Sequence, residues 1–511
     1  MSEEIDLAGI KVPKADWDAT PTSVRVALSA LIDLFTGRLV QLETENQSLR
    51  ARVAHLEEQL KQNSQNSSKP ASKDGFGKQV KSVRARKESK LDHQPRQAPE
   101  HYPIESCAAI HEQIPEICHD CGTALRGEDE TPYRHQVIEI PPIAPTVIEY
   151  RLHQLECEHC GAKTRGTLPI GVSGRVYGDR LAAIVALLSS EYRQSHRMVQ
   201  SLMHTLLGVT LSRGSVNRLR QEMSEALCPS ATEAQTYIQY QAVIHSDETS
   251  FKQGNQDKLN PKKTQGWIWT LVTPLVCFFE VVLSRSGATA QALIGKDFKG
   301  IVVSDRYSSY SWLDLSQRQA CWAHLKRDFT AIAERSGVSQ EIGEALLFRE
   351  RRLFRWWHQV RDGTLSRQEF KALVQPLREG LKAELEGAAS LPIGDQEKTP
   401  LAKTVRTCRQ LLKVECTLWT FVDIPGVEPT NNHAERALRP AVIWRRTSFG
   451  SQSRAGSLFV SRMLTVVTSL KAQHADVLEF LTQACRAART GLTPPSLIPQ
   501  PHIPDDISLA A

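Results

Sequence analysis

The chain has 511 residues, too many for one ordinary domain, and its hydrophobic content of 41% is enough to build several cores. The formal net charge of +6 is a mild excess, and residues 61–99 account for it with ten lysines and arginines against three acids. No apolar segment follows the opening MSEEIDLAGI, and the longest apolar stretch, 270–283, is too short to cross a bilayer. These features argue against a secreted or membrane-spanning protein, and we expect a cytoplasmic one.

Residues 22–64 predict one long helix with a heptad repeat of apolar side chains. Asn46 occupies one of the inward heptad positions, where a polar residue commonly fixes the register of a parallel dimer. We expect a self-associating coiled coil, and the alternative is a helix packed on its own chain. The Ser-, Asn- and Lys-rich segment 65–99 predicts a disordered basic linker that suits a polyanionic partner.

Four cysteines have the spacing of a zinc ribbon. They lie in two Cys-x-x-Cys pairs, each followed by glycine, in ICHDCG and LECEHCG: Cys118, Cys121, Cys157 and Cys160. Four thiolates close a tetrahedral Zn²⁺ site without an open position, so we predict structural zinc, with redox pairs or chance as the alternatives. Two strand-like runs between the pairs, RHQVIEIPP and TVIEYRLHQL, predict a hairpin inside a zinc-ribbon domain of residues 100–172.

Residues 173–232 predict a helical region that contains a helix-turn-helix. A first helix is expected to end near Leu207, followed by a turn at 208–210 and a second helix from about 212–215. The second helix is expected to expose side chains that read base edges and bind phosphate: Arg213, Asn217, Arg218, Arg220 and Gln221. Because two helices around a glycine turn occur in many helical domains, ordinary packing is the alternative.

From residue 233 the pattern changes to three strands, a short helix and a further strand. The segments are QAVIHSDETSF, the hairpin of GWIWTLVT and LVCFFEVVL, the helix GATAQALIG and the strand GIVVSDRYSSY. This order is that of an RNase H-like fold, in which a central strand carries one carboxylate and the neighbouring fourth strand carries a second at its end. Asp247 and Asp305 occupy these positions, and we expect them to lie side by side.

A third carboxylate is expected from a later helix, and Glu435 in TNNHAERALRP is the candidate. Phosphodiester chemistry commonly uses two Mg²⁺ ions held by oxygen ligands. We therefore predict Asp247, Asp305 and Glu435 as catalytic residues and as ligands of Mg²⁺ or Mn²⁺. Glu248 adjoins Asp247 on a strand and points to the opposite face, which makes it a less suitable ligand. For Glu435 alone, a solvated surface ion pair is the alternative.

Other candidates surround these carboxylates in the sequence. We expect contacts with the DNA backbone from Asn432, Arg436, Arg439, Arg445 and Arg446, with ordinary surface charge as the alternative. Cys321 and His324 form a Cys-x-x-His pair after Asp305. Because a second metal site needs more ligands than these two, we expect this pair to pack in the core or to support the active site, with a metal site as the alternative.

The chain contains, in this order, NSSKPASKDG, the two cysteine pairs, YGDRLAAIVALL, GVTLSRGSV, HSDET, VVSDRYSSY, CWAHLKRDF and NNHAERALRP. This series resembles the insertion-sequence sixty-six family of bacterial DDE transposases over nearly the whole chain. The resemblance implies a DDE triad at Asp247, Asp305 and Glu435, binding to terminal inverted repeats with help from the zinc region, and Mg²⁺-dependent strand cleavage and strand transfer. It also implies a nucleoid-associated protein with small accessory proteins as partners. Ser250 departs from the family, which usually has glycine after Asp-Glu-Thr.

Together these features predict a multidomain α+β protein. Its expected parts are a coiled-coil helix (22–64), a basic linker (65–99), a zinc ribbon (100–172), a helical DNA-binding region (173–232), the first part of an RNase H-like α/β core (233–327), an inserted all-helical domain (328–422), the last part of the core with the catalytic helix (423–490) and a Pro-rich tail (491–511). The predicted function is a DNA transposase that acts as a homodimer or higher multimer. The alternatives are a catalytically inactive zinc-ribbon DNA-binding regulator and an RNase H-like DNA nuclease that does not transpose.

Overall fold

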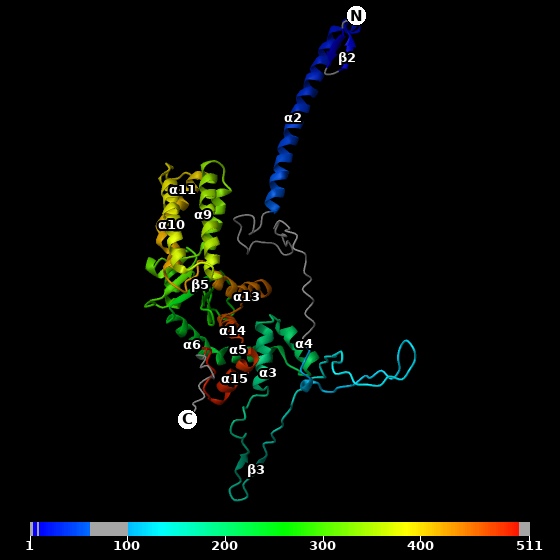
Figure 1. Cartoon of the computed structure of the whole chain (residues 1–511), viewed down its shortest axis with the longest axis vertical. Helices are drawn as coiled ribbons and strands as arrows, with labels where there is room; N and C mark the ends of the chain where they lie inside the picture. The colour runs from blue at the N-terminus through cyan, green and yellow to red at the C-terminus, as the bar shows by residue number, and fades with distance from the viewer. Residues whose placement is uncertain (1–3, 8–9, 62–100, 500–511) are drawn as a thin grey trace.

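The computed structural model describes residues 4–7, 10–61 and 101–499 (Figure 1). The predicted linker at 65–99 and residues 500–511 of the predicted tail lie outside these ranges. The chain opens with a small hairpin that the sequence reasoning missed, made of β1 (Glu4–Leu7) and β2 (Ile10–Pro13), and with the short helix α1 (Lys14–Ala19). None of the helices within the described ranges is both long enough and apolar enough to cross a membrane.

The predicted N-terminal helix is present as α2 (Thr22–Lys61), which extends away from the remainder of the molecule (Figure 1). Its apolar heptad side chains are exposed to solvent. Phe35, Leu39 and Leu49 are 63%, 60% and 61% exposed, respectively. The helix is therefore confirmed, and its apolar stripe is not covered by the described part of its own chain.

The region that carries the cysteine pairs has little regular structure. It contains the 3-10 turn η2 (Ile104–Ser106) and a short hairpin of β3 (Gln154–Glu156) and β4 (Lys163–Arg165). The predicted hairpin between the two cysteine pairs is wrong, because residues 134–153 form no strand. Val137 and Val147 in these runs are 83% and 84% exposed, so no packed face holds them as strands. The tight turn at the second cysteine pair instead brings β3 and β4 together around it.

A five-stranded mixed sheet forms the centre of the molecule, with the strand order β7-β6-β5-β8-β9. Its strands are β5 (Val243–Ser250), β6 (Trp267–Val272), β7 (Cys277–Val282), β8 (Ile301–Ser304) and β9 (Arg318–Ala320). β5 pairs antiparallel with β6, and β6 with β7, whereas β5 and β8, and β8 and β9, pair in parallel. Four strands and the helix α7 (Gly287–Ile294) lie where the sequence predicts them. The three-residue β9 was missed because it is too short to show a period.

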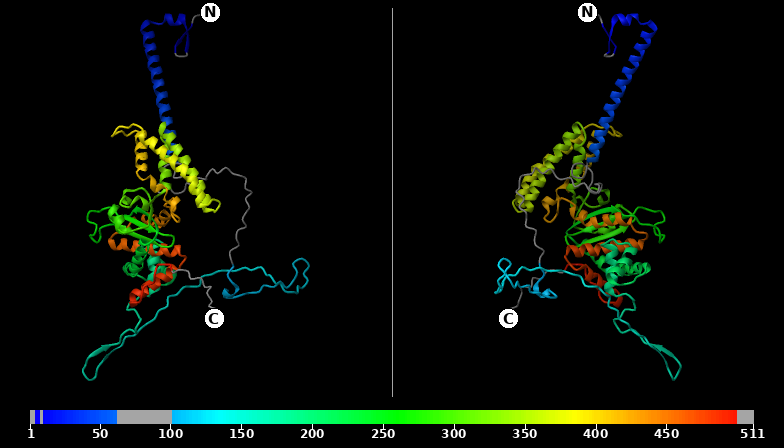
Figure 2. Two further views of the ribbon diagram at one scale, coloured as in Figure 1. Left: turned by 60° about the vertical axis from the view of Figure 1, so that its left-hand side comes forward. Right: turned by 90° about the vertical axis from the view of Figure 1, so that its right-hand side faces the viewer.

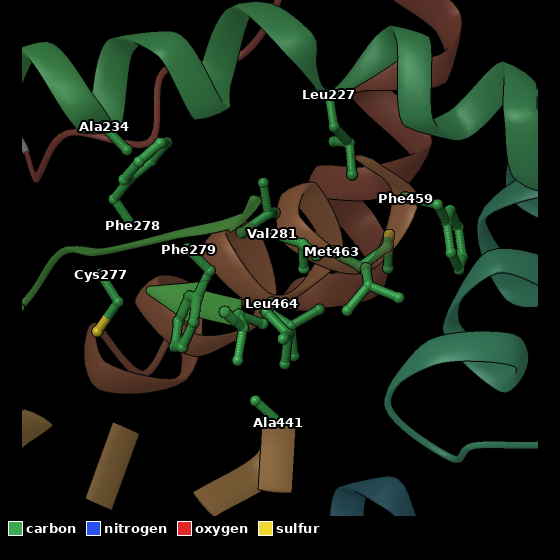
Figure 3. Close-up of a cluster of buried hydrophobic side chains, with 14 of the residues drawn as sticks. Leu227, Ala234, Cys277, Phe278, Phe279, Val281, Ala441, Phe459, Met463 and Leu464 are labelled. Carbon is green, nitrogen blue, oxygen red and sulfur yellow. The ribbon is translucent and has the colours of Figure 1, made fainter. Parts of the chain in front are cut away.

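Two C-terminal helices pack against the sheet. α13 (Asn432–Ser448) contacts β5 and β6, and α14 (Arg454–Ala472) contacts β7. Figure 3 shows apolar side chains of β7 and α14 in one buried cluster, including Phe279, Val281, Phe459, Met463 and Leu464. This cluster fixes α13, and with it Glu435, on the sheet.

Hydroxyl groups of α14 also cover the free edge of β7. The backbone N–H groups of Cys277, Phe279 and Val281 donate hydrogen bonds of 2.9 Å to three hydroxyls of the helix, those of Ser469, Thr465 and Ser461. Four helical residues advance about 6 Å and two strand residues about 6.7 Å, so the two spacings match over three contacts. Edge strands otherwise present unpaired donors to other chains, and α14 closes this edge.

A group of helices packs against α14 (Figure 2). It consists of α3 (Asp179–Ser190), α4 (His196–Leu207), α5 (Arg213–Ala226), α6 (Cys228–Gln239) and α15 (Val477–Thr490). The predicted helix-turn-helix corresponds to α4 and α5, whose turn is made at Gly208 with a φ of 64°. The buried Arg489 joins three of these helices, because it donates to Glu222 in α5 at 2.9 and 3.0 Å and to Asp179 in α3 at 2.9 Å.

The predicted helical segment between the second and third carboxylates is present. Its helices are α8 (Trp322–Ala333), α9 (Val338–Arg361), α10 (Arg367–Ser390), α11 (Pro400–Leu412) and α12 (Thr420–Asp423), and the 3-10 turns before or among them are η3 (Ser308–Tyr310), η4 (Leu315–Gln317) and η5 (Glu415–Leu418). α9 and α10 project from the sheet as a long hairpin (Figures 1 and 2). A second apolar core, which includes Trp357, Phe370 and Phe421, holds this segment together.

Candidate active site

The two predicted aspartates lie on neighbouring parallel strands. β5 and β8 pair in parallel up to His245 and Val303, so Asp247 follows two residues after the last paired residue of β5 and Asp305 follows directly after β8. Backbone amides orient both carboxylates: the N–H of Glu248 donates to Asp247 at 2.8 Å, and the N–H of Tyr307 donates to Asp305 at 2.9 Å. The pairing of the two strands and these backbone hydrogen bonds thus position both aspartate side chains.

Glu435 comes from the first turn of α13, and its side chain is 41% exposed. Burial raises the pKa of Asp247 well above its usual range, and the charges of Glu248, Asp305 and Glu435 act in the same direction. Partial burial also raises the pKa of Glu435, with Asp305 adding to the effect and Arg327 opposing it. Asp305 and Glu435 thus both disfavour the ionisation of Asp247, and Asp305 also disfavours that of Glu435.

The Glu248 carboxylate forms hydrogen bonds with two neighbouring side chains. It accepts hydrogen bonds from Arg285 at 2.8 Å and from the Tyr310 hydroxyl at 2.6 Å. The Arg285 guanidinium lies 3.6 Å from the ring centre of Tyr307. Because Tyr307 also supplies the amide that binds Asp305, this group of side chains supports the backbone around the second aspartate. The sequence reasoning missed Arg285 and Tyr310, since nothing in the local pattern relates them to Glu248.

Asn431 is fully buried directly before α13 and connects three segments. Its side-chain amide donates to the carbonyl of Ser246 at 2.8 Å and contacts His245 Nδ1 at 3.2 Å, while its backbone N–H donates to Cys321 Sγ at 3.1 Å. The Asn431 side chain is therefore engaged in contacts within the protein. The adjacent Asn432 is exposed.

Arg445 ties the far end of α13 to the end of β5. Its guanidinium donates to the Thr249 hydroxyl at 2.8 Å and to the carbonyl and hydroxyl of Ser250 at 2.9 and 2.7 Å. The serine that departs from the family pattern is therefore used as a hydrogen-bond acceptor. These partners leave Arg445 less available to DNA than the sequence suggested, whereas Arg436, Arg439 and Arg446 have exposed side chains.

The predicted DNA-reading residues of α5 separate into two groups. Arg213, Asn217, Arg218 and Gln221 are exposed as expected. Arg220 is not, because it follows Val216 by one helical turn on the face of α5 that packs inward. Its guanidinium lies 4.3 Å from the ring centre of Phe459 and hydrogen-bonds His196, and burial lowers its pKa to about 10.

A cavity of about 510 Å³ lies between this helical group and α14. Asn217 and Arg220 from α5 line one side, together with Arg193, and Trp444 from α13 lines another. The Nε atoms of Arg193 and Arg220 are buried without a hydrogen-bond partner. Donors from the predicted helix-turn-helix and the end of α13 thus face one space.

The two cysteine pairs adopt the same tight turn. In the first, the N–H of Gly122 donates to Cys118 O at 2.9 Å, and in the second Gly161 donates to Cys157 O at 2.8 Å, with φ angles of 73° and 71° at the two glycines. Hydrogen bonds with Thr123 lower the pKa of Cys121 to about 7. Each pair fits half of a zinc site, because thiolates are the form that binds zinc. The four sulfurs do not all lie within 4.8 Å of one another among the described residues.

Cys321, His324 and Glu435 form a cluster that the sequence reasoning found only in part. Cys321 is the N-cap of α8 and His324 lies in its first turn. One ligand atom from each of the three residues lies within 4.8 Å of the other two, and His324 Nδ1 is 3.8 Å from a Glu435 oxygen. The Cys-x-x-His spacing showed two members, but the third is more than a hundred residues away. In the described part of the chain, the oxygens of Asp247, Asp305 and Glu435 do not all meet this distance limit.

Family comparisons cover most of the chain. The model of the "Transposase IS66 family" matches residues 174–458, and that of the "zinc-finger binding domain of transposase IS66" matches residues 115–161. A family of unknown function matches residues 20–100. The first two matches contain the carboxylates and the cysteine pairs described above.

Two proteins of Sinorhizobium fredii are similar to the chain. The uncharacterized protein y4qI is 27% identical over 249 residues, which cover 43% of this chain and 43% of that protein. The uncharacterized protein y4hP is 24% identical over 395 residues, which cover 71% of this chain and 68% of that protein. The similarity thus spans less than half the length of the first relative and about two thirds of the second.

Proposed function

The chain belongs to the IS66 family of transposases, and we propose that it cuts DNA at the ends of a mobile element and joins those ends to target DNA through Asp247, Asp305 and Glu435. The observation that carries this proposal is the parallel pairing of β5, which contains Asp247, with β8, which Asp305 follows directly. The charge interactions that link Asp247 to Asp305 and Glu435 support a single site.

We propose that the sheet and its helices form an RNase H-like core. Supporting this are the strand order, the antiparallel second strand and the parallel fourth and fifth strands. The helices α9–α11 interrupt the path from the second aspartate to α13, in agreement with an insertion at 328–422 between core parts 233–327 and 423–490. The boundaries of the coiled coil, zinc ribbon and DNA-binding region belong to the same proposal.

The donor set suits Mg²⁺ or Mn²⁺, because three carboxylates supply hard oxygen ligands. Bound ions would supply positive charge for the attacking and leaving oxygens of the phosphodiester. Their positive charge would also favour the ionised forms of Asp247 and Glu435, whose pKa values are raised by burial and by neighbouring carboxylates. Asn431 is a positioning residue, since its hydrogen bonds hold β5, α8 and the start of α13 together around the carboxylates.

DNA binding is supported by the exposed basic residues on two surfaces. Arg213 and Arg218 lie on α5, and Arg436 and Arg439 lie on α13 beside Glu435. The two cysteine pairs add a structural zinc site when they come together. Exposed apolar positions along α2 favour pairing with a second copy, which suits a reaction that joins two DNA ends.

A strand-transfer assay with the DNA ends of the element that encodes this protein tests the proposal. Glu435→Gln keeps the size of the side chain and removes its charge. Glu479→Gln is a matched control, because Glu479 is likewise an exposed glutamate in the first turn of a helix, α15, which contacts α3 and α5. We expect wild type and Glu479→Gln to join ends to target DNA with Mg²⁺, and Glu435→Gln to bind ends without forming product.

Other outcomes separate the alternatives. If Glu435→Gln joins ends as well as wild type does, Glu435 is not a catalytic ligand. If wild type cuts DNA but never joins it to a target, the protein is a nuclease. Specific binding of ends without any cleavage by wild type in Mg²⁺ favours a DNA-binding regulator.

A further inference from the structure

Cys321, His324 and Glu435 bring three different metal-binding chemistries together beside the proposed triad. A sulfur, an imidazole nitrogen and a carboxylate oxygen lie within 4.8 Å of one another. We propose that these residues bind a thiophilic divalent ion such as Zn²⁺, and that this ion competes with Mg²⁺ for Glu435.

Backbone hydrogen bonds hold the donors in place. The N–H of Cys321 donates to the carbonyl of Ser304 at 2.9 Å, which anchors the start of α8 to β8. The N–H of Trp322 donates to Pro429 at 2.9 Å, and the N–H of Asn431 donates to Cys321 Sγ at 3.1 Å. The first turns of α8 and α13 are thus fixed against each other, so ligand binding requires side-chain motion only.

His324 gives an independent indication of a ligand. Its Nδ1 atom is buried and has no hydrogen-bond partner, although it lies 3.8 Å from a Glu435 oxygen. Buried polar atoms are nearly always hydrogen-bonded, so an exception calls for an explanation. Bond lengths of about 2.0 Å to nitrogen and oxygen and 2.3 Å to sulfur separate donors around tetrahedral zinc by about 3.3–3.6 Å. Small movements of the three side chains reach that geometry.

The donor set selects the kind of ion. Mg²⁺ prefers oxygen ligands and keeps its waters, whereas Zn²⁺ accepts sulfur, nitrogen and oxygen together. Three protein ligands leave a fourth position open, and the side chains of His324 and Glu435 are 29% and 41% exposed, so water can reach it. Zinc held here would draw Glu435 away from Asp247 and Asp305. Zinc binding stands on the geometry alone, while its effect on catalysis rests on the proposed function.

Metal analysis after equilibrium dialysis of the whole chain against Zn²⁺ tests the site. Cys408→Ser is the control, because Cys408 is a buried cysteine of α11 outside the cluster. We expect wild type and Cys408→Ser to retain one zinc ion more than Cys321→Ser and Glu435→Gln. The serine hydroxyl can still accept the Asn431 N–H, and circular dichroism checks that the variants are folded. Equal zinc content in all four proteins would overturn the proposal.

The competition is measured separately, by adding Zn²⁺ to the strand-transfer assay in Mg²⁺. We expect zinc to reduce product for wild type and Cys408→Ser, and to reduce it less for Cys321→Ser. Equal inhibition of the three proteins refutes the competition. If the zinc contents differ as expected but no protein forms product, the proposed function fails while the metal site stands.

Discussion

Replacement of Thr465 by valine tests the contact that closes the sheet edge. The Thr465 hydroxyl accepts the N–H of Phe279 at 2.9 Å and is fully buried. Valine has nearly the same shape but cannot accept a hydrogen bond, so Phe279 is left with an unsatisfied buried donor. Such a group costs about 1–3 kcal/mol, which corresponds to about 5- to 150-fold in an opening equilibrium.

Hydrogen-exchange mass spectrometry of peptides that contain β7 measures this opening. We expect the Phe279 amide to exchange about 5- to 150-fold faster in Thr465→Val than in wild type. Thr482→Val is the matched control, because the buried Thr482 hydroxyl donates to the carbonyl of Leu478 at 2.7 Å, within its own helix. Exchange of Phe279 at the same rate in wild type and both variants would refute the assignment of the hydroxyls as a cover for the strand edge.

Three further predictions concern the carboxylates, the buried amide and the cysteine pairs. Because the pKa of Asp247 is raised in the folded state, the metal-free folded protein loses stability as pH rises through that pKa. Asp247→Asn should therefore raise the Tm of the metal-free protein at neutral pH and abolish the Tm increase caused by Mg²⁺. An unchanged Tm response to Mg²⁺ would contradict this prediction. Asn431→Ala removes the partner of a buried carbonyl and should cost about 1–3 kcal/mol in denaturant unfolding, whereas the exposed Asn432→Ala should change stability little; equal effects would refute the bridging role. Cys121, with a pKa of about 7, should be alkylated at neutral pH much faster than Cys408, whose pKa is raised by burial to about 11. Zinc should protect Cys121 from alkylation, and mass spectrometry of the labelled peptides measures both effects.

Helix α5 shows which features of a helix the local sequence pattern can predict. Apolar spacing and the glycine turn predicted both helices of the helix-turn-helix, and they are present as α4 and α5. The same pattern did not predict that Arg220 packs against Phe459, because that ring belongs to a helix more than two hundred residues later. The exposure of one side chain depends on which distant element covers its face.

The zinc region shows the opposite limit. The spacing of the cysteines predicted a zinc ribbon, and each pair does form a tight turn with a positive φ angle at the glycine that follows it, Gly122 or Gly161. The strands expected between them do not form, since alternating apolar residues are held as strands only where another layer buries one face. The sequence of this region does not show whether such a layer covers the predicted strands.

Local sequence patterns predicted the helical regions and four of the five central strands, because the periods of these elements are local properties of the chain. The predicted order of the strands also indicated that Asp247 and Asp305 lie on neighbouring strands. Glu435 was identified as the carboxylate expected from a later helix. The buried bridging position of Asn431 and the contact of Glu435 with Cys321 and His324 became visible only in the folded structure. Those contacts join residues more than a hundred positions apart, and no local period encodes which distant side chains share a site.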